Sequence, residues 1–278
     1  MSHHLIGSTL GNYKLEKVLR NTPTGQVFLA HHPSTNMHVE VKVVLDDKDA
    51  DPKLRERLER ELQTLTRINH PNAVRTWAVG RDGAVSYVVT EHIDGRPLKS
   101  WLEELGRLRW QDALRVFIHV MRGLEAIHSF NVVHRDITPE NILLGNDGRV
   151  VVADFSSVKL VGSDGAATNT AVASDFLGNL YISPEQLSGE QVDARTDIYC
   201  AGMCLYHALA ARLPFETKGG ITTLLQRLNV EPKPLRELVP DVPAPVEATV
   251  MRCIAAEPDE RFASATEARK ALEKLVRR

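Results

Sequence analysis

The chain has 278 residues, which is enough for one large domain or for two lobes that share a core. Its 34 basic and 36 acidic residues nearly balance, so the composition gives no reason to expect nucleic acid or an anionic membrane as a partner. The hydrophobic share of 43% is typical of a globular protein, and no apolar stretch approaches the roughly 20 residues of a membrane span.

The cysteines and the N-terminus indicate the compartment. Cys200, Cys204 and Cys253 are too few and too odd in number for a disulfide framework. Cys200 and Cys204 lie one helical turn apart in an apolar run, which favours buried thiols over a metal site. The N-terminus lacks a signal-peptide pattern. A reduced, cytoplasmic location is therefore expected, with a longer natural protein that carries a downstream membrane anchor as the alternative.

The first part of the chain predicts a small antiparallel sheet with one helix, because apolar and polar residues alternate with turn residues between them. The five predicted strands lie around residues 13–18, 27–29, 39–44, 74–79 and 85–90. Asp51-Pro52 predicts a helix start, and leucines at helical spacing continue this helix to about Asn69. Gly95-Arg96-Pro97 then breaks the pattern and is predicted to be a linker.

From Pro97 onward the sequence is mostly helical. Helices are predicted at 113–128, 198–211, 243–256 and 264–276. The run from Ile198 is apolar nearly all round, which marks a fully buried helix, and Ser264 with Glu267 forms a capping-box pattern. Residues 150–152 predict a short strand, whereas the polar, aperiodic stretch 156–180 predicts a long surface loop.

The most informative stretch is residues 134–144, with the sequence HRDITPENILL. It places an acid, Asp136, five residues before an amide, Asn141, and the triplet Asp154-Phe155-Ser156 follows ten residues after the apolar run. An acid at this spacing can orient a hydroxyl group while the amide and the second acid hold a metal ion. Each residue alone would more often be structural, but the combination is much more specific.

These motifs resemble the catalytic loop and metal-binding triplet of Hanks-type protein kinases, and the whole chain is most similar to bacterial serine/threonine kinases. The resemblance implies an α+β, bilobal kinase-like fold formed by a single domain over residues 1–278. Residues 12–93 would form the small lobe, with an antiparallel sheet and one helix. Residues 94–97 would form the hinge, and residues 98–278 the larger, mainly helical lobe.

The resemblance also implies a set of catalytic residues. Asp136 would be the base that orients the acceptor hydroxyl, and Asn141 and Asp154 would hold Mg²⁺. Lys42 resembles the family's lysine, which grips the α- and β-phosphates of ATP, and Glu61 resembles its helix partner. The alternatives are turn caps for the polar loop residues and solvated surface charges for Lys42 and Glu61. These groups, far apart along the chain, are expected to converge in one cleft.

ATP is the second implied cofactor, and five further residues would contact it. The implied nucleotide contacts besides Lys42 are Gly25, Val27, Glu91, Ile93 and Leu143. The contacts of Glu91 and Ile93 would be made by main-chain groups of the hinge, so their identities carry little information.

Other matches concern structural support and regulation. Ser183-Pro184-Glu185 resembles the family's Ala/Ser-Pro-Glu triplet, and Arg261 its buried ion-pair partner. Asp197 would brace the catalytic loop, and His128 is expected to be a core or capping histidine. Arg135 marks the subclass whose long loop is ordered by phosphorylation. The candidate phosphorylation sites are Thr168, Thr170 and Ser174, with solvated hydroxyls as the alternative.

Several positions depart from the family pattern. In the phosphate-binding loop only Gly25 is kept, and Arg20 and Thr22 replace the other two glycines. Glu40 stands where the family has alanine against adenine, so its carboxylate must be desolvated or swing out, and it could repel phosphate. Three further departures lie in the larger lobe: Thr138 replaces a lysine of the catalytic loop, Ser156 replaces a glycine, and Gly178-Asn179 stands where a threonine braces the catalytic acid.

Two functions follow. The preferred one is a slow serine/threonine protein kinase that uses ATP and Mg²⁺, since the lysine, acid and amide set is complete. The alternative is a pseudokinase, a signalling or scaffolding module with weak or no nucleotide binding, which the departures at the ATP site favour. Either function predicts a protein substrate or signalling partner, no nucleic acid and no membrane segment in this chain, and leaves a homodimer open.

Overall fold

The computed structural model describes residues 5–22, 25–35, 37–45, 62–83, 85–155, 159–160, 179–215 and 226–277. The chain divides into two compact units. The first contains Met1–His70 and Val74–Asp94, and the second contains Pro71–Ala73 and Gly95–Arg278.

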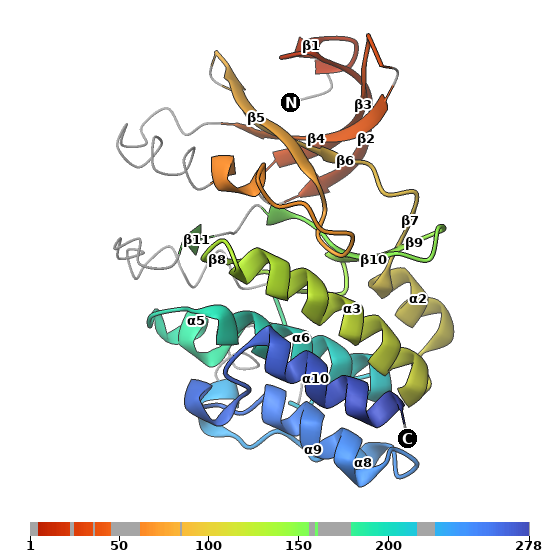
Figure 1. The fold of residues 1–278 in the computed structure, drawn as a ribbon, viewed down its shortest axis with the longest axis vertical. Coiled ribbons are helices and arrows are strands. Elements are labelled where there is room, and N and C mark those ends of the chain that lie inside the picture. The colour runs from red at the N-terminus through yellow and green to blue at the C-terminus, as the bar shows by residue number, and fades with distance from the viewer. Residues whose placement is uncertain are drawn as a thin grey trace. The chain divides into compact units, whose positions relative to one another are not determined.

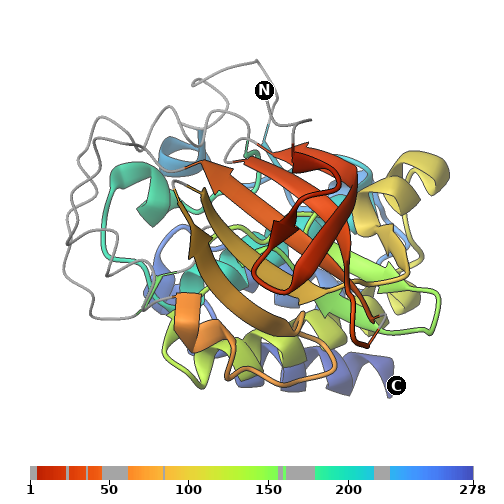
Figure 2. The ribbon, with the colours of Figure 1, turned by 90° about the horizontal axis from the view of Figure 1, so that it is seen from above.

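The first unit is built on a six-stranded antiparallel sheet, as the alternating pattern predicts. Its strands, in spatial order, are β1 (Thr9–Leu10), β2 (Tyr13–Thr22), β3 (Gly25–His32), β4 (Met37–Leu45), β6 (Val85–Glu91) and β5 (Thr76–Asp82). Figure 2 shows the strong twist of this sheet. Strands β2 to β6 confirm the five predicted strands, with ends that differ by a few residues.

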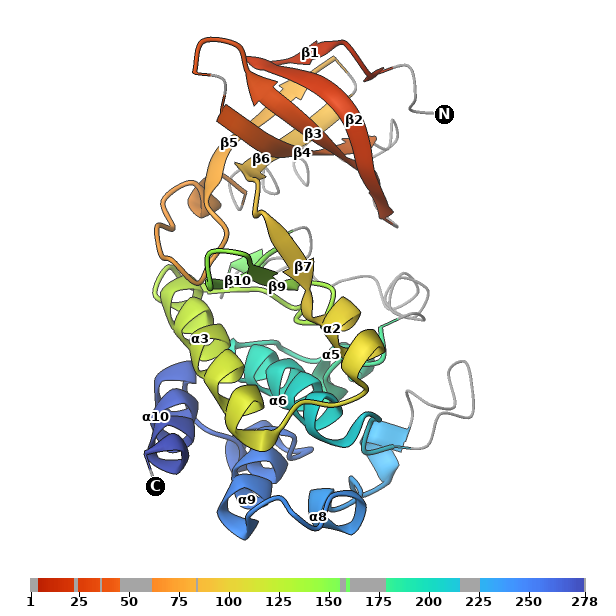
Figure 3. The same ribbon diagram turned by 90° about the vertical axis from the view of Figure 1, so that its right-hand side faces the viewer.

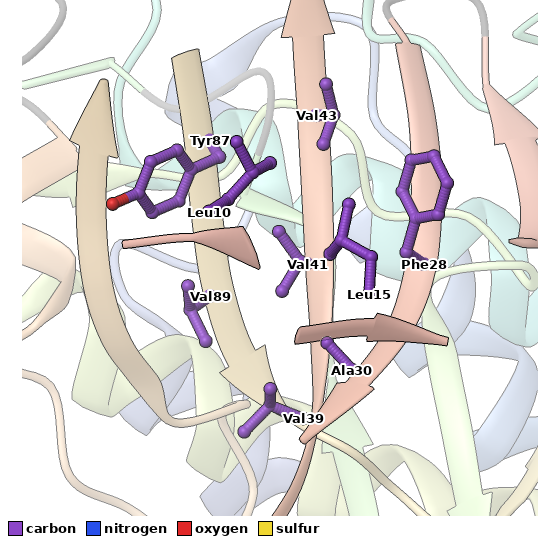
Figure 4. Close-up of a cluster of buried hydrophobic side chains, with 9 residues drawn as sticks. All are labelled: Leu10, Leu15, Phe28, Ala30, Val39, Val41, Val43, Tyr87 and Val89. Carbon is purple, nitrogen blue, oxygen red and sulfur yellow. The ribbon is translucent and has the colours of Figure 1, made fainter. Parts of the chain in front are cut away.

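One face of the sheet carries the apolar core of the unit. Val39, Val41 and Val43 of β4 project to this face and pack with Phe28 of β3 and with five further buried residues (Figure 4). Because successive side chains of a strand point to opposite faces, Glu40 and Lys42 project from the other face. These two charged residues of β4 therefore lie together on the face of the sheet opposite the apolar core.

The predicted helix of the first unit is described only at its end. Residues 62–65 are helical, and Leu65 and Ile68 are completely buried. The predicted start at Asp51-Pro52 and the candidate residue Glu61 lie outside the described residues.

The second unit is mainly helical. Its described helices are α2 (Leu98–Leu105), α3 (Trp110–His128), α5 (Pro184–Ser188), α6 (Ala194–Ala210), α8 (Leu235–Leu238), α9 (Ala244–Cys253) and α10 (Ala265–Val276), with a short 3₁₀ helix, η3 (Pro258–Glu260). Helix α3 packs between α6 and α10 (Figures 1 and 3). This arrangement confirms the four predicted helices. Among the described residues, no helix is long and apolar enough to span a membrane.

Helix α6 is buried all round, as its sequence predicts. Every residue from Thr196 to Tyr206 is buried, including Cys200 and Cys204. All three cysteines are free, buried thiols. Burial raises the pKa of each thiol well above its ordinary value, so these sulfurs stay protonated and inert. The prediction of core thiols is confirmed.

Short strands in the second unit frame the candidate site. Strands β10 (Val150–Val152), β9 (Ile142–Gly145) and β7 (Gly95–Pro97) form one small sheet, and β8 (Val132–Val133) pairs with β11 (Lys159–Leu160). The predicted linker residues Gly95-Arg96-Pro97 therefore form a paired strand. A Cβ atom on Gly95 would collide with the carbonyl oxygen of Leu144, so glycine permits this close pairing.

The predicted loop 156–180 also contains a short strand. Lys159 and Leu160 pair with β8, whereas residues 156–158 and 161–178 lie outside the described residues. Two-residue pairing of this kind leaves no period in a sequence, which explains why the pattern suggested only a loop.

The capping boxes differ from the prediction. Ser264 accepts a hydrogen bond from the Glu267 backbone N–H at 3.2 Å, but the Glu267 carboxylate accepts from Ala263 instead of returning to Ser264. The reciprocal box is found instead at α5, between Ser183 and Gln186.

Candidate active site

The loop that begins at His134 and carries Asp136 is held by Asp197, in the first turn of α6. Its carboxylate accepts the backbone N–H groups of His134 and Arg135, both at 2.8 Å, and contacts His128 Nε2 at 2.7 Å. Burial alone would raise the pKa of Asp197, but the hydrogen bond and charge of His128 and the hydrogen bond from the His134 backbone hold it below its ordinary value. The predicted bracing role of Asp197 is thereby confirmed. His128, predicted to be a core or capping histidine, is instead a hydrogen-bond partner of this buried carboxylate.

His134 fixes the next part of the loop. Its ring is completely buried, with Nδ1 3.3 Å from the backbone nitrogen of Asp136 and Nε2 3.0 Å from the carbonyl oxygen of Ala153. A backbone N–H must meet an acceptor and a carbonyl must meet a donor, so the proton of this ring lies on Nε2. His134 thus links the loop to the end of β10.

Two residues of this region have backbone conformations that are unusual for side-chain-bearing residues. Arg135 has φ of 69° and Asp154 has φ of 64°, both in the left-handed region. Such conformations cost on the order of 1–3 kcal/mol and persist where surrounding contacts hold them in place. The contacts of Asp197 with the Arg135 N–H, and of Gln186 with the Arg135 carbonyl at 2.9 Å, provide that support at Arg135.

The carboxylate of Asp136 is fixed at both oxygens. Asn141 Nδ2 donates to Asp136 Oδ2 at 3.0 Å and to the Asp136 carbonyl oxygen at 2.8 Å, and Asn179 Nδ2 donates to Asp136 Oδ1 at 2.9 Å. Asp136 and Asn141 therefore lie together, as the five-residue spacing predicts. Asn179, which stands where the resembled family has a bracing threonine, therefore also contacts this carboxylate.

Asn141 and Asp154 lie at the same end of the β9–β10 hairpin. Ile142 is paired with Val152, and the Ala153 N–H donates to the Asn141 carbonyl oxygen at 2.8 Å. Because Asn141 Nδ2 donates its hydrogen bonds to Asp136, the Oδ1 atom of Asn141 is the one that could coordinate a cation. An amide oxygen and a carboxylate are hard ligands of the kind that Mg²⁺ prefers, so the donor set fits this ion. Among the described residues, no group of three His, Cys, Asp or Glu side chains could hold a metal on its own.

In the first unit, Lys42 lies on the face of β4 opposite the apolar core. It pairs with Val27 of β3 and with Val88 of β6, so these side chains share that face. Gly25 and Val27 begin β3, Glu91 ends β6 and Ile93 is buried two residues later. The Glu91 carboxylate accepts the Arg75 backbone N–H at 3.0 Å. Leu143 lies on β9 of the second unit.

Glu40 shares the face of Lys42 and is buried rather than swung out. It is 9% exposed, with Oε2 2.8 Å from Arg20 Nη1 and Oε1 3.1 Å from His92 Nδ1. Burial alone would raise the pKa of Glu40, but these two partners hold it below its ordinary value. The hydrogen bond to Glu40 in turn raises the pKa of His92. Arg20 and His92 thus engage both carboxylate oxygens of Glu40.

Sequence reasoning missed His92 as a partner of Glu40 and Gln186 as a partner of Arg135. The register could have revealed the first, since Glu40 lies opposite Thr90 and His92 follows two residues later. The second contact joins residues 51 positions apart and leaves no local signal.

A buried ion pair joins α5 to the residue that follows η3. Both Arg261 and Glu185 are almost fully buried, and the guanidinium meets the two carboxylate oxygens at 2.8 and 2.9 Å. Thr196 and three backbone carbonyl groups satisfy the remaining polar atoms. The predicted buried pair is confirmed.

Several residues named in the sequence-based predictions lie outside the part of the chain that the structure describes. They include Glu61, Ser156, Thr168, Thr170, Ser174 and Gly178. Thr138 is described and buried at 8% exposure, in the position where the resembled family has a lysine.

Comparisons with known proteins agree with this arrangement. Residues 13–274 match the family model described as protein kinase domain. The chain is 34% identical over 263 residues to a probable serine/threonine-protein kinase of Streptomyces coelicolor, covering 93% of this chain and 39% of that protein. It is 29% identical over 263 residues to the serine/threonine-protein kinase PrkC of Bacillus subtilis, covering 94% of this chain and 40% of PrkC.

A solved structure with a similar fold is the kinase domain of Mycobacterium tuberculosis PknI, with a TM-score of 0.76 at 24% identity, covering 97% of this chain and 98% of that one. The chain spans about two fifths of the length of the curated relatives it matches.

Proposed function

Because this chain belongs to the protein kinase domain family, whose members generally use ATP and Mg²⁺, we propose that it transfers the γ-phosphoryl group of ATP to serine or threonine hydroxyls of proteins. The observation that carries the proposal is the fixed carboxylate of Asp136. Both of its oxygens accept amide hydrogen bonds, and the loop that carries it is braced by the buried Asp197.

The roles of the residues follow from their chemistry. Asp136 accepts a hydrogen bond from the attacking hydroxyl and takes its proton, which aligns the oxygen for in-line attack. Asn141 Oδ1 and Asp154 would hold Mg²⁺, which supplies charge neutralisation for the phosphate oxygens when bound. Lys42 would bind the α- and β-phosphates, with Glu61 as its partner, and Gly25, Val27, Glu91, Ile93 and Leu143 would contact the nucleotide.

The reaction is proposed to be slow. Thr138 cannot supply the positive charge that a lysine would give to the transferred phosphoryl group. Loss of one preorganised electrostatic contact typically lowers the rate about 10²–10³-fold. The pseudokinase alternative is not favoured, because the relatives reported above are named as kinases and the described catalytic loop has its acid and amide in contact.

The partner is proposed to be a protein substrate, and the location to be the cytoplasm. The three free thiols suit a reducing compartment.

The test is phosphoryl transfer by the purified chain. With Mg²⁺ and ATP labelled at the γ-phosphate, the wild-type chain should label itself or casein, and Asp136→Asn should lower the rate at least about 10²-fold. Asp147→Asn is the matched control, since this exposed acid lies in the turn at the far end of the β9–β10 hairpin. Equal labelling by wild type and Asp136→Asn would refute the proposal, as would the absence of any label.

A further inference from the structure

Asn179 contacts the candidate base from a distant part of the chain. It lies 43 residues after Asp136, just before the segment that leads into α5, and its Nδ2 atom donates to Asp136 Oδ1 at 2.9 Å. Asn141 holds only the other oxygen, Oδ2. Without Asn179, the carboxylate would lose this amide donor at Oδ1, which restrains rotation about its terminal torsion.

The orientation of the Asn179 amide is determined by its second contact. Asn179 Oδ1 accepts the Tyr181 backbone N–H at 2.8 Å. A flipped amide would place an oxygen against the Asp136 carboxylate and an NH₂ group against an N–H, which are two unfavourable pairings. The NH₂ group therefore faces Asp136.

The two residues that follow Asn179 are anchored to other parts of the second unit. Buried Arg227 donates to the carbonyl oxygen of Leu180, and the Tyr181 hydroxyl meets His207 Nδ1 of α6 at 2.7 Å. Burial lowers the pKa of His207 and raises the pKa of Tyr181, so the phenol is the donor and the neutral imidazole the acceptor. Asn179 is thus held in place before any substrate arrives.

The chemistry of the contact suits a base. An amide donates a hydrogen bond without neutralising the carboxylate, whereas a charged donor would also lower its basicity. The residue that replaces the family's lysine, Thr138, is neutral as well. The two amide contacts each fix one carboxylate oxygen of Asp136, and misplacement of a reacting group by about 1 Å can lower a rate about 10²-fold.

We propose that Asn179 is a positioning residue for phosphoryl transfer: its amide fixes Asp136 Oδ1 and so aims the carboxylate at the acceptor hydroxyl. This inference rests on the proposed kinase function. Asn179 would then take the place of the threonine that the family has at this position.

The experiment compares three variants of Asn179 in the full chain. Asn179→Ala should lower kcat about 10–100-fold while the KM for ATP changes less than about threefold, because the nucleotide contacts are untouched. Asn179→Thr keeps a donor and should recover a large part of kcat. Asn69→Ala, which alters an exposed asparagine in the first unit, is the control and should leave kcat unchanged.

Asn179→Asp tests the contact with Asp136 directly, because it should change the pH dependence of kcat, which a loss of structural support alone would not change. A second carboxylate at hydrogen-bonding distance disfavours ionisation of Asp136, so the acidic limb of the kcat–pH profile should shift to higher pH. The carboxyl ¹³C NMR titration of Asp136, identified by its loss in Asp136→Asn, should show the same shift even where turnover is slow. Thermal midpoints within about 3 °C of wild type would show that the variants remain folded.

The outcomes separate this inference from the proposed function. If wild type is active and Asp136→Asn is not, but Asn179→Ala keeps kcat within twofold and Asn179→Asp shifts neither the profile nor the NMR titration, the positioning role is wrong and the kinase function stands. If wild type transfers no phosphate at all, the kinase function fails, and the positioning role fails with it.

Discussion

Glu40 illustrates how a single residue that violates a sequence pattern can be accommodated by its neighbours. An uncompensated buried carboxylate is strongly destabilising, and it would normally become protonated. Here Arg20 of β2 and His92, just after β6, each meet one carboxylate oxygen. The charge is therefore kept and shared among three side chains of the first unit.

The raised pKa of His92 predicts a pH dependence of stability. A group whose pKa is raised on folding contributes stability that is fully present below its unfolded pKa, about 6.5, and is lost as the pH rises through the folded value. The free energy of unfolding of wild type minus that of His92→Gln should thus fall from about 1 kcal/mol at pH 5.5 towards zero at pH 8.5. Urea denaturation at several pH values measures this difference.

The control is the same substitution in a Glu40→Gln background. There the imidazole has no carboxylate partner, so His92→Gln should change stability by a similar small amount at every pH. A wild-type difference that grows with rising pH would contradict the assigned sign. The lowered pKa of Glu40 affects stability at acidic pH. Its contribution to the free energy of unfolding is present above about pH 4.5 and is lost as the pH falls through the folded pKa.

At the scale of secondary-structure elements, the buried pair of Arg261 and Glu185 ties α5 to the segment that follows η3. Arg261→Ala would leave the Glu185 carboxylate, at 4% exposure, with Thr196 as its remaining side-chain partner. The expected loss is about 3–5 kcal/mol in the free energy of unfolding. Since α5 also holds the Arg135 carbonyl through Gln186, phosphoryl transfer should fall as well.

The matched control is Arg115→Ala, which removes an exposed i,i+3 partner of Asp112 on α3. It should change the free energy of unfolding by less than about 0.5 kcal/mol. Urea denaturation of both variants gives the comparison. Similar small losses in the two variants would show that the buried pair contributes no more than a surface pair.

The elements also show what the sequence could predict. Strands β2 to β6 and the helices α3, α6, α9 and α10 carry long periodic patterns, and each was predicted with the right type. The strands β7 and β11 have only three and two residues, too short for a period, and their pairing is set by distant partners. Local chemistry was also insufficient at Ser264, where both possible capping partners were present and only one bond formed.

For the site, the spacing of Asp136 and Asn141 predicted their contact because both lie in one short loop. The partners of Glu40 and the second support of Asp136 depend on residues 20 to 52 positions away. Such contacts follow from strand register and from the path of the chain before α5, which no local pattern encodes. The positions that looked like losses in the sequence, Glu40 and Asn179, were those whose compensation needed the structure.

At the scale of the whole molecule, the proposal predicts that nucleotide stabilises the folded chain. A ligand that binds only the native state, at about 100 times its Kd, adds about 2.7 kcal/mol to the free energy of unfolding. For a chain of this size that corresponds to a rise of roughly 5 °C in Tm. We expect such a rise with ATP and Mg²⁺, measured by differential scanning fluorimetry, and a smaller rise with ATP and EDTA.

The dependence on Mg²⁺ should map to the hairpin end where Asn141 and Asp154 lie. Asp154→Asn removes the carboxylate charge, so the added rise in Tm due to Mg²⁺ should disappear while part of the rise due to ATP alone remains. Asp147→Asn, at the exposed turn of the same hairpin, should keep the full Mg²⁺ effect. If Asp154→Asn kept it too, Asp154 would not be a ligand of the ion, and the magnesium site would have to be sought among other residues.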